Sequence, residues 1–383
     1  MDTEVPTRRG GLSAENPVLH GVRPFLAPSP VISDGVSGFA TATPRAGRRS
    51  RLLDRALARP SSSAIGGLVA AVVLFGLLVP DLLTAGGLAG VLDVAATLGI
   101  GAVAVALLLV AGQFDFSIGA LAGASALLSA LLVVERGWSA WPALGAGLVA
   151  ALLVGVVNGV LVVNTGLPSF LVTLATLLVL QGLVSHGIGV ITDSGRVDFL
   201  DDAPGWAAAD ALFASGLEVG GGRFRVSLLW FLAVTAVATW ALWRTRFGNA
   251  LFAIGGAPRA ATELGVPVRR TTVTLFCLTA GAGWLIGVLA LTRVGGAVAA
   301  VPGLASGVDF LVVAVIGGCL LTGGWGSVFG AAVASVLYAV ARQGISLAGW
   351  DPQWFQMLLG VLLLVALVAN GIVLRRLKAA PRS

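Results

Sequence analysis

The sequence contains few charged residues. Asp, Glu, Lys and Arg account for 11% of its 383 residues, whereas 57% are hydrophobic. Soluble domains average about 25% charged residues, so a soluble fold of this composition would expose a largely apolar surface. The composition therefore predicts an all-α polytopic membrane protein, because long apolar stretches cross a bilayer as helices.

Lysine is almost absent, since Lys378 is the one lysine in the chain. A nucleotide-binding loop of the G-x-x-x-x-G-K-[ST] type needs a lysine to contact the phosphates. The sequence therefore excludes ATP binding of that type by this chain.

Cysteine and histidine are also scarce. Cys277 and Cys319 lie inside apolar runs, where free cysteines pack as small core residues, and His20 and His186 stand alone. No His, Cys and Asp residues gather at ligand spacing. We therefore expect no metal site and no catalytic residue in this chain.

Long apolar runs, by contrast, are abundant. Ten of them come close to the roughly 17–25 residues that a transmembrane helix needs. The eighth is short and ends in Gly323, Gly324 and Gly326, so we expect a broken or re-entrant helix there. The expected spans are Ala64–Leu83, Leu88–Ala111, Ser117–Val134, Pro142–Val163, Ser169–Ile191, Val226–Trp243, Thr271–Leu291, Asp309–Leu321, Val328–Leu347 and Phe355–Leu374.

Arginine orients these spans. The loop 244–270 carries five arginines and one acid, and short loops rich in arginine face the cytoplasm. Ten spans put both termini on one side, so cytoplasmic tails at 1–62 and 375–383 are expected to flank a transmembrane domain at 63–374. The loop 192–225, with six acids and three arginines, is expected outside.

The first tail is rich in Pro, Gly, Ser and Arg and has no apolar period, which predicts disorder. The net charge of +6 is explained by the arginines of the tails and the 244–270 loop. We therefore expect no nucleic-acid partner.

The basic loop contains the signals of a short helix. An Ala-rich stretch runs from Pro258 to Leu264 and is followed by Gly265. Proline favours the first turn of a helix, and glycine favours the position just after its end. A short cytoplasmic helix between two spans is suited to docking onto a soluble partner.

Two distant segments echo each other. Asn158-Gly159 precedes Pro168-Ser169-Phe170, and Gln343-Gly344 precedes Pro352-Gln353-Trp354. The copies lie five spans apart, an odd offset that reverses their orientation. This pattern favours an inverted five-plus-five repeat, as in many transporters, with chance similarity of apolar sequence as the alternative.

Three pairs of glycines lie four residues apart within or beside the spans. Such pairs let helix backbones approach closely in a membrane, so we expect tight helix packing at these positions. The pairs are Gly155 with Gly159, Gly283 with Gly287, and Gly326 with Gly330.

Three acids fall within or beside the spans, where a charge is costly and points to function. Asp115 either caps the helix that begins near Ser117 or organises the lining of a substrate path. Asp309 is expected to cap the eighth span, and Asp93 to reach water near the outer surface.

Polar residues also follow one another along the fourth and fifth spans. They either line a path for a hydroxylated solute or form hydrogen bonds with the backbone of their own helices. This polar trail consists of Asn158, Asn164, Ser169, Thr173, Thr176 and Gln181.

Four segments, in order and spacing, resemble motifs of the ribose-type permeases of ATP-binding-cassette (ABC) sugar importers. Gly112–Leu121 is similar to their G-x-D-L-S-V-G element, and Gly166–Leu174 to their L-P-x-F-I-x-T-L segment. Thr245–Val266 is similar to their coupling loop, and Gly317–Ser327 to a late glycine-rich element. The resemblance covers roughly residues 64–374.

The chain departs from these motifs at a few positions. Phe116 replaces a leucine, Gln113 and Phe114 stand where the family has one residue, Asn249 replaces an arginine, and Ala257 replaces an asparagine. The resemblance therefore predicts the architecture and leaves the transported solute open.

The resemblance implies a division of labour. A second copy of the permease would complete the pore in a homodimer of the bacterial inner membrane, and an extracytoplasmic binding protein would deliver a monosaccharide. A separate cytoplasmic subunit would hold ATP and Mg²⁺, so this chain would bind no cofactor. The expected ATPase-coupling residues are Gly255, Gly256, Arg259, Ala261, Glu263 and Gly265. The expected pathway residues are Asp115, Ser117, Asn158, Pro168, Ser169, Phe170 and Thr173.

Other functions fit the same bundle. One is an ABC permease for branched-chain amino acids or another small polar metabolite. Others are an ion-coupled secondary transporter and a passive channel. The spans show no chain of buried acids or histidines of the kind that relays protons, which disfavours a proton-driven mechanism.

Overall fold

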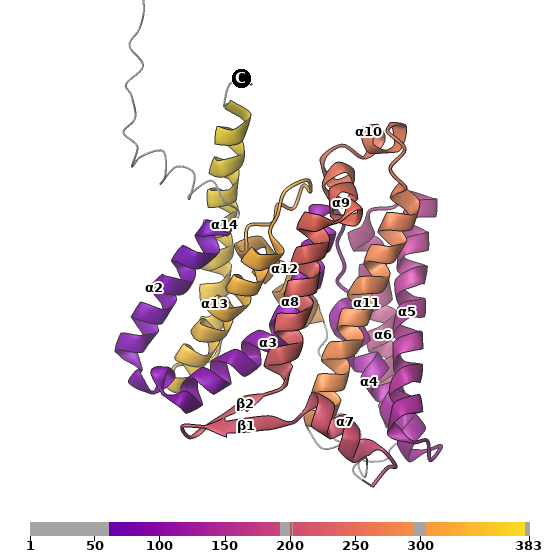
Figure 1. Ribbon diagram of the computed structural model, residues 1–383, viewed down its shortest axis with the longest axis vertical. Coiled ribbons are helices and arrows are strands. Elements are labelled where there is room, and N and C mark those ends of the chain that lie inside the picture. Colours follow the sequence, from indigo (N-terminus) through magenta and orange to yellow (C-terminus); the bar gives the residue numbers. More distant parts are fainter. Residues whose placement is uncertain (1–60, 192–199, 201, 294–303, 380–383) are drawn as a thin grey trace, which may run out of the picture. The chain divides into compact units, whose positions relative to one another are not determined.

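A computed structural model describes residues 61–191, 200, 202–293 and 304–379 of the chain (Figure 1). The expected N-terminal tail, apart from its last two residues, lies outside this part of the chain. The residues described belong to one compact unit, which is built almost entirely of helices.

Each of the ten expected spans corresponds to a helix in the described part of the chain. Seven of these helices are long and apolar enough to cross a membrane, and the other three are shorter apolar helices. The prediction of an all-α polytopic membrane protein is thereby confirmed. The helices are α2 (Ser62–Leu78), α3 (Ala85–Val110), α4 (Ile118–Val134), α5 (Ala140–Thr165), α6 (Ser169–Ile191), α8 (Ser227–Arg244), α11 (Val268–Arg293), α12 (Leu304–Ile316), α13 (Val328–Leu347) and α14 (Gln353–Ala379).

The first span is shorter than predicted. It was expected to continue to Leu83, but α2 ends at Leu78 and a 3₁₀ turn, η1 (Pro80–Leu83), follows. Proline disfavours helical backbone in the residue before it, and Val79 is accordingly extended, with φ −137° and ψ 83°. Pro80 thus ends the α-helix five residues early.

The eighth span is shifted towards the N-terminus. The expected range was Asp309–Leu321, but α12 covers Leu304–Ile316. Asp309 therefore lies inside the helix and is not its cap. Its carboxylate instead accepts a hydrogen bond from the Tyr338 hydroxyl of α13 at 2.9 Å.

The loop 192–225 holds regular structure that the sequence did not predict. It contains a short helix, α7 (Trp206–Phe213), and an antiparallel hairpin of β1 (Gly216–Val219) and β2 (Gly222–Arg225). The two-residue turn between the strands is Gly220-Gly221, with both φ angles positive, as the tightest hairpin turns require.

The basic loop 244–270 also folds into two helices. The predicted helix is present as α10 (Pro258–Glu263), and an unpredicted one, α9 (Arg246–Gly256), precedes it. Helices α9 and α10 lie at one end of the bundle, together with the C-terminal end of α14 (Figure 1). We call this the coupling end, and the opposite end, which carries α7 and the β-hairpin, the hairpin end.

Helix α3 forms the core of the unit. Every residue from Gly99 to Ala111 is buried, and the helix contacts α8, α11, α12 and α13. A helix that is apolar on all sides is expected to be enclosed by its neighbours in this way.

Two of the three glycine pairs pack helices together as predicted, whereas Gly326 of the third pair lies in the loop before α13. On α5, a methyl group at Gly159 would lie 2.8 Å from the Cα atom of Val273 in α11. On α11, a methyl group at Gly283 would lie 3.1 Å from the carbonyl oxygen of Ile118 in α4. Since each methyl group would meet backbone of the neighbouring helix, α11 can approach α4 and α5 only where the glycines lie.

The two segments that echo each other form helix–turn–helix units. The first is the turn between α5 and α6, and the second is the turn between α13 and α14. The second turn lies at the hairpin end, where Trp350 contacts Phe75 of α2. The first lies at the coupling end, where Ser169 contacts the loop that follows α3. This opposite placement agrees with an inverted repeat, which stays a prediction.

Candidate functional site

A chain of hydrogen bonds joins the start of α4 to α5 and α6. The Ser117 hydroxyl and backbone N–H both donate to the Asp115 carboxylate, at 2.6 and 2.8 Å. The Asn158 amide of α5 donates to the Ser117 hydroxyl at 3.1 Å, and the Thr176 hydroxyl of α6 donates to the Asn158 oxygen at 2.6 Å. Asp115, Ser117 and Asn158 are all buried.

Two further residues of α6 hold the same loop by its backbone. The Ser169 hydroxyl accepts a hydrogen bond from the Phe114 N–H at 2.9 Å, and the Thr173 hydroxyl accepts one from the Phe116 N–H at 3.2 Å. Both hydroxyls are buried. The loop between α3 and α4, residues 111–117, is therefore fixed to α6 at two backbone positions.

Five of the seven expected pathway residues thus belong to one network. Asp115 was expected to cap this helix, but the N-cap position of α4 is occupied by Ser117, and the Asp115 carboxylate instead accepts the Ser117 N–H just before the helix begins. Burial of a carboxylate is tolerated where hydrogen bonds satisfy it, and this one accepts two from Ser117. Whether the network also lines a substrate path stays a prediction.

The other two expected pathway residues, Pro168 and Phe170, are exposed and lie on the rim of a pocket. This pocket has a volume of about 280 Å³ and lies between loop 111–117 and the turn that joins α5 to α6. Gln113 and the buried Ser169 contribute polar groups to it, and Phe114 and Leu167 contribute apolar surface. We call it the coupling-end pocket.

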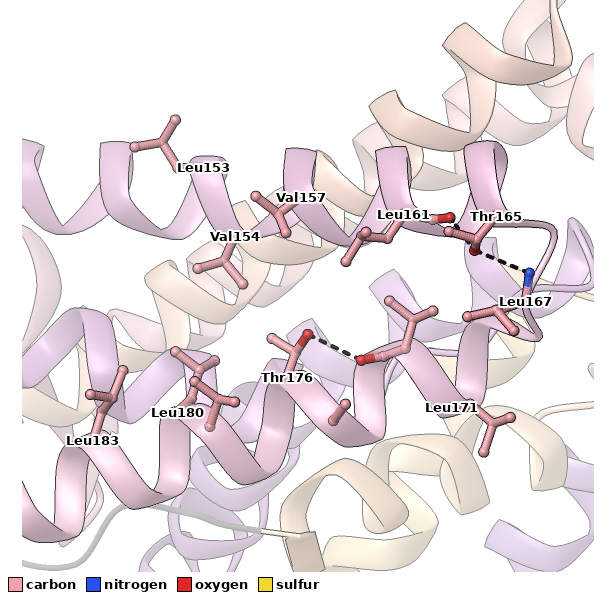
Figure 2. Close-up of a pocket in the computed structure, with 13 residues that line it drawn as sticks. Leu153, Val154, Val157, Leu161, Thr165, Leu167, Leu171, Thr176, Leu180 and Leu183 are labelled. Carbon is pink, nitrogen blue, oxygen red and sulfur yellow. Dashed lines mark hydrogen bonds between the residues drawn. The ribbon is translucent and has the colours of Figure 1, made fainter.

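A larger cavity of about 640 Å³ lies along α5 and α6 (Figure 2). Apart from Thr165 and Thr176, its lining is apolar. The Thr165 hydroxyl donates to the Leu161 carbonyl oxygen, and the Thr176 hydroxyl, which donates to Asn158, has the Val172 carbonyl oxygen as a second, more distant acceptor at 3.1 Å. Most of the apolar side chains shown in Figure 2 are exposed, including Leu153, Leu171 and Leu183. A surface of this kind suits the apolar interior of a membrane, because it offers no free hydrogen-bonding group.

The coupling end presents the second group of expected residues. Arg259 and Glu263 are exposed on α10, whereas Ala261 is buried against the bundle. The helix ends as predicted, because Gly265 adopts a left-handed backbone conformation. The N–H groups of Gly265 and Val266 donate to the carbonyl oxygens of Thr262 and Ala261, as is common at helix ends. Leu264 beside it is 83% exposed, so α10 offers an apolar side chain flanked by charges.

Gly255 and Gly256 are the last two residues of α9, and one residue, Ala257, separates this helix from α10. Gly256 is exposed, whereas Gly255 is packed against the end of α3. Of the six expected coupling residues, Gly256, Arg259, Glu263 and Gly265 are therefore exposed, and Ala261 packs inward. Gly255 joins the segment of α9 and α10 to the core at the end of α3.

Sequence reasoning missed a charged cluster at the hairpin end. Asp93 of α3 was expected to reach water, but its carboxylate forms ion pairs with Arg293 of α11 and with Arg225 of β2, the latter at 3.7 Å. The Ser227 hydroxyl of α8 also donates to it, at 3.2 Å. All three charged side chains are about 20–30% exposed.

A signal for this cluster was present in the sequence. Asp93 lies five residues inside its predicted span, while Arg225 and Arg293 lie at the ends of two others, all on the same predicted side of the membrane. Opposite charges at one depth in a membrane tend to pair. That argument places the three residues on one side of the membrane but does not select their partners; in the structure the cluster joins α3, α8, α11 and the β-hairpin.

Comparison with known proteins gives the family. The family described as "Branched-chain amino acid transport system / permease component" matches residues 87–367. The galactose/methyl galactoside import permease of Salmonella typhimurium is 30% identical over 292 residues, which cover 72% of this chain and 84% of that protein. No solved structure matches the chain.

Other relatives are permeases named for different solutes. The fructose import permease of Rhizobium meliloti is 28% identical over 73% of this chain and 76% of its own length. The autoinducer 2 import permease of Klebsiella pneumoniae is 29% identical over 82% of this chain and 92% of its own length.

The family match leaves out α2 but covers the buried network and the helices α9 and α10 of the coupling end. These matches favour a permease that works with separate ATPase and binding-protein subunits over an ion-coupled transporter or a channel. The chain therefore belongs to this permease family, as a multi-pass inner-membrane subunit of a bacterial ABC transporter.

Proposed function

We propose that the chain is the permease of a monosaccharide importer. The observation that carries this proposal is the match along most of the chain to permeases named for galactose and fructose. The chain's own polar residues are compatible with a hydroxylated solute, since Ser, Thr, Asn and Gln side chains exchange hydrogen bonds with hydroxyl groups.

In this proposal the coupling end faces the cytoplasm. The arginine-rich loop 244–270 favours that side, and an even number of crossings would place both termini there. The exposed groups of α10 (Arg259, Glu263 and Leu264) would dock onto a separate subunit that holds ATP and Mg²⁺, while this chain binds no cofactor. A central apolar residue surrounded by charges is a common composition for such a contact.

The solute would be delivered at the hairpin end by an extracytoplasmic binding protein and released at the coupling end. The coupling-end pocket, at about 280 Å³, is close to the lower limit of the range found for ligand pockets and is suited to a small solute. The buried network from Asp115 to Thr176 would keep loop 111–117, which forms one wall of this pocket, in place. Two copies of the chain would form the complete pathway, as a homodimer.

Transport by purified components tests this proposal. The chain, its ATPase subunit and its solute-binding protein are reconstituted in liposomes, and uptake of labelled galactose, fructose, ribose and leucine is measured with and without ATP. We expect uptake of at least one sugar that requires ATP and both partners. Preferential uptake of leucine would support the second candidate, a branched-chain amino acid permease, which the description of the matching family favours.

Uptake by the chain alone, driven by an ion gradient or by the solute gradient, would contradict the proposal. Orientation is tested separately by labelling single cysteines in intact cells. An Arg259→Cys variant is expected to react only after the membrane is permeabilised, whereas a Glu218→Cys variant in the β-hairpin reacts without permeabilisation. The reverse pattern would overturn the assigned sides.

A further inference from the structure

Three backbone segments that are distant in sequence meet at glycines of the coupling end. They are the end of α3 with Gly112, the end of α9 with Gly255, and the loop between α12 and α13 with Gly323 and Gly324. The Gly324 N–H donates to the carbonyl oxygen of Val110 at 2.9 Å. We call Val110, Gly112, Gly255, Gly323 and Gly324 together the glycine junction.

The junction has no room for side chains. A methyl group at Gly255 would overlap both the carbonyl oxygen of Val110 and the backbone nitrogen of Gly324. One at Gly323 would lie 2.8 Å from the Cα atom of Gly112. Gly323 and Gly324 also have φ angles of +79° and +75°, which glycine alone adopts without strain. The three segments therefore touch backbone to backbone.

The glycine junction lies between α10, the proposed docking helix, and the coupling-end pocket. On one side, Gly255 is three residues before Pro258, where α10 begins. On the other side, Gly112 is followed directly by Gln113 and Phe114, which line the coupling-end pocket. Phe114 is in turn held by the Ser169 hydroxyl of α6.

Backbone contacts transmit displacement in a way that side-chain contacts do not. A side chain can change rotamer and absorb a small movement of its neighbour, whereas close-packed backbone has no such freedom and low compressibility. A shift of α9 therefore has to move the end of α3 and the α12–α13 loop, or else separate them.

We propose that the glycine junction transmits the movement of α10 to the pocket loop 111–117 and to the α12–α13 loop. Gly255, Gly323 and Gly324 are positioning residues in this mechanism. The inference rests on the proposed function, because it takes α10 as the site where the ATPase subunit acts. It adds the route by which that action reaches the solute pathway.

A Gly255→Ala variant tests the route in the reconstituted importer. ATP hydrolysis is measured together with uptake of an equimolar mixture of labelled galactose, fructose and ribose. We expect the sugar transported per ATP hydrolysed to fall about tenfold, within the range of coupling between linked sites, while the ATPase subunit still binds. A Gly281→Ala variant in α11, where a methyl group would have nothing within 4 Å, is expected to stay within twofold of wild type.

Wild-type coupling in the Gly255→Ala variant would overturn the inference and leave the proposed function intact. If that variant does not accumulate in the membrane, amide hydrogen exchange measured on the wild-type complex tests the inference instead. A non-hydrolysable ATP analogue is expected to change exchange in peptides covering 110–116 and 320–326 together with 253–264. A change confined to 253–264 would contradict the inference. Binding of the ATPase subunit without any protection of α10 would contradict both the inference and the proposed function.

Discussion

The two ends of the helix bundle are held together by different interactions. At the hairpin end, Asp93 joins α3, α8, α11 and β2 through two ion pairs and a hydrogen bond from Ser227. At the coupling end, α3, α9 and the α12–α13 loop meet through backbone contacts at glycines.

This difference suits the different tasks proposed for the two ends. Ion pairs between partly exposed side chains can separate and re-form, because water reaches both partners. Glycine contacts between backbones keep segments together through a movement. The coupling end is thus suited to transmit the movement proposed for α10, because its segments touch backbone to backbone.

The largest effect is expected from reversing one charge on α10. A Glu263→Arg variant should lose stimulation of the ATPase subunit by at least about tenfold, because an exposed charge in the docking surface then repels its partner. The variant should remain in the membrane at wild-type amounts, since Glu263 is exposed. ATP hydrolysis by the reconstituted complex measures this.

The matched control is Glu135→Arg, the same reversal at an exposed position after α4. It should leave ATPase stimulation unchanged, and a positive charge there even favours the helix end. Normal coupling in Glu263→Arg would remove α10 from the proposed docking surface.

The second effect concerns the charged cluster of the hairpin end. An Asp93→Asn variant leaves Arg225 and Arg293 without their carboxylate, and we expect a loss of about 2 kcal/mol in the free energy of unfolding. Denaturant titration in detergent micelles measures the loss. Adding Arg293→Gln should restore part of it, because removal of both charges leaves fewer charges unpaired.

Asp81→Asn serves as control, since Asp81 is an exposed carboxylate close to the same end. We expect it to change stability by less than about 0.5 kcal/mol. An equal loss in both variants would mean that the cluster contributes nothing specific to the hairpin end.

The smallest effect is expected from the buried network that supports the coupling-end pocket. An Asn158→Leu variant removes the bonds to Ser117 and Thr176, and hydrogen bonds between membrane helices contribute about 0.6 kcal/mol each. We therefore expect a loss of about 1 kcal/mol in stability, measured in the same titration. Asn164→Leu makes the same change at an exposed position of α5 and should have little effect, so that equal losses would contradict the role given to the network.

The sequence predicted most of the helices because each apolar run carries its own signal. Where it was wrong, local chemistry or packing explains the difference. Pro80 ended α2 early, and α12 begins at Leu304, before Asp309, in a segment that holds no proline to stop the helix. The β-hairpin and α9 were missed, since both are short and lie in loops that were assigned only by charge.

The sequence predicted which residues belong to the candidate site but not how they contact one another. The motifs indicated Asp115, Ser117, Ser169 and Thr173, the polar trail indicated Asn158, and the structure brings all five into one network. It could not be predicted from the motifs that these side chains bond to one another and to the loop backbone. Their partners lie as far as 57 residues away along the chain.

The sequence by itself determined the apolar helices and the short helix that stops at Gly265, because hydropathy, proline and glycine act over a few residues. Only the tertiary structure decided that Asp93 pairs with Arg293, 200 residues away, and that glycines of three distant segments form one junction. The physical reason is that such contacts depend on how the helices pack. No single segment carries that information.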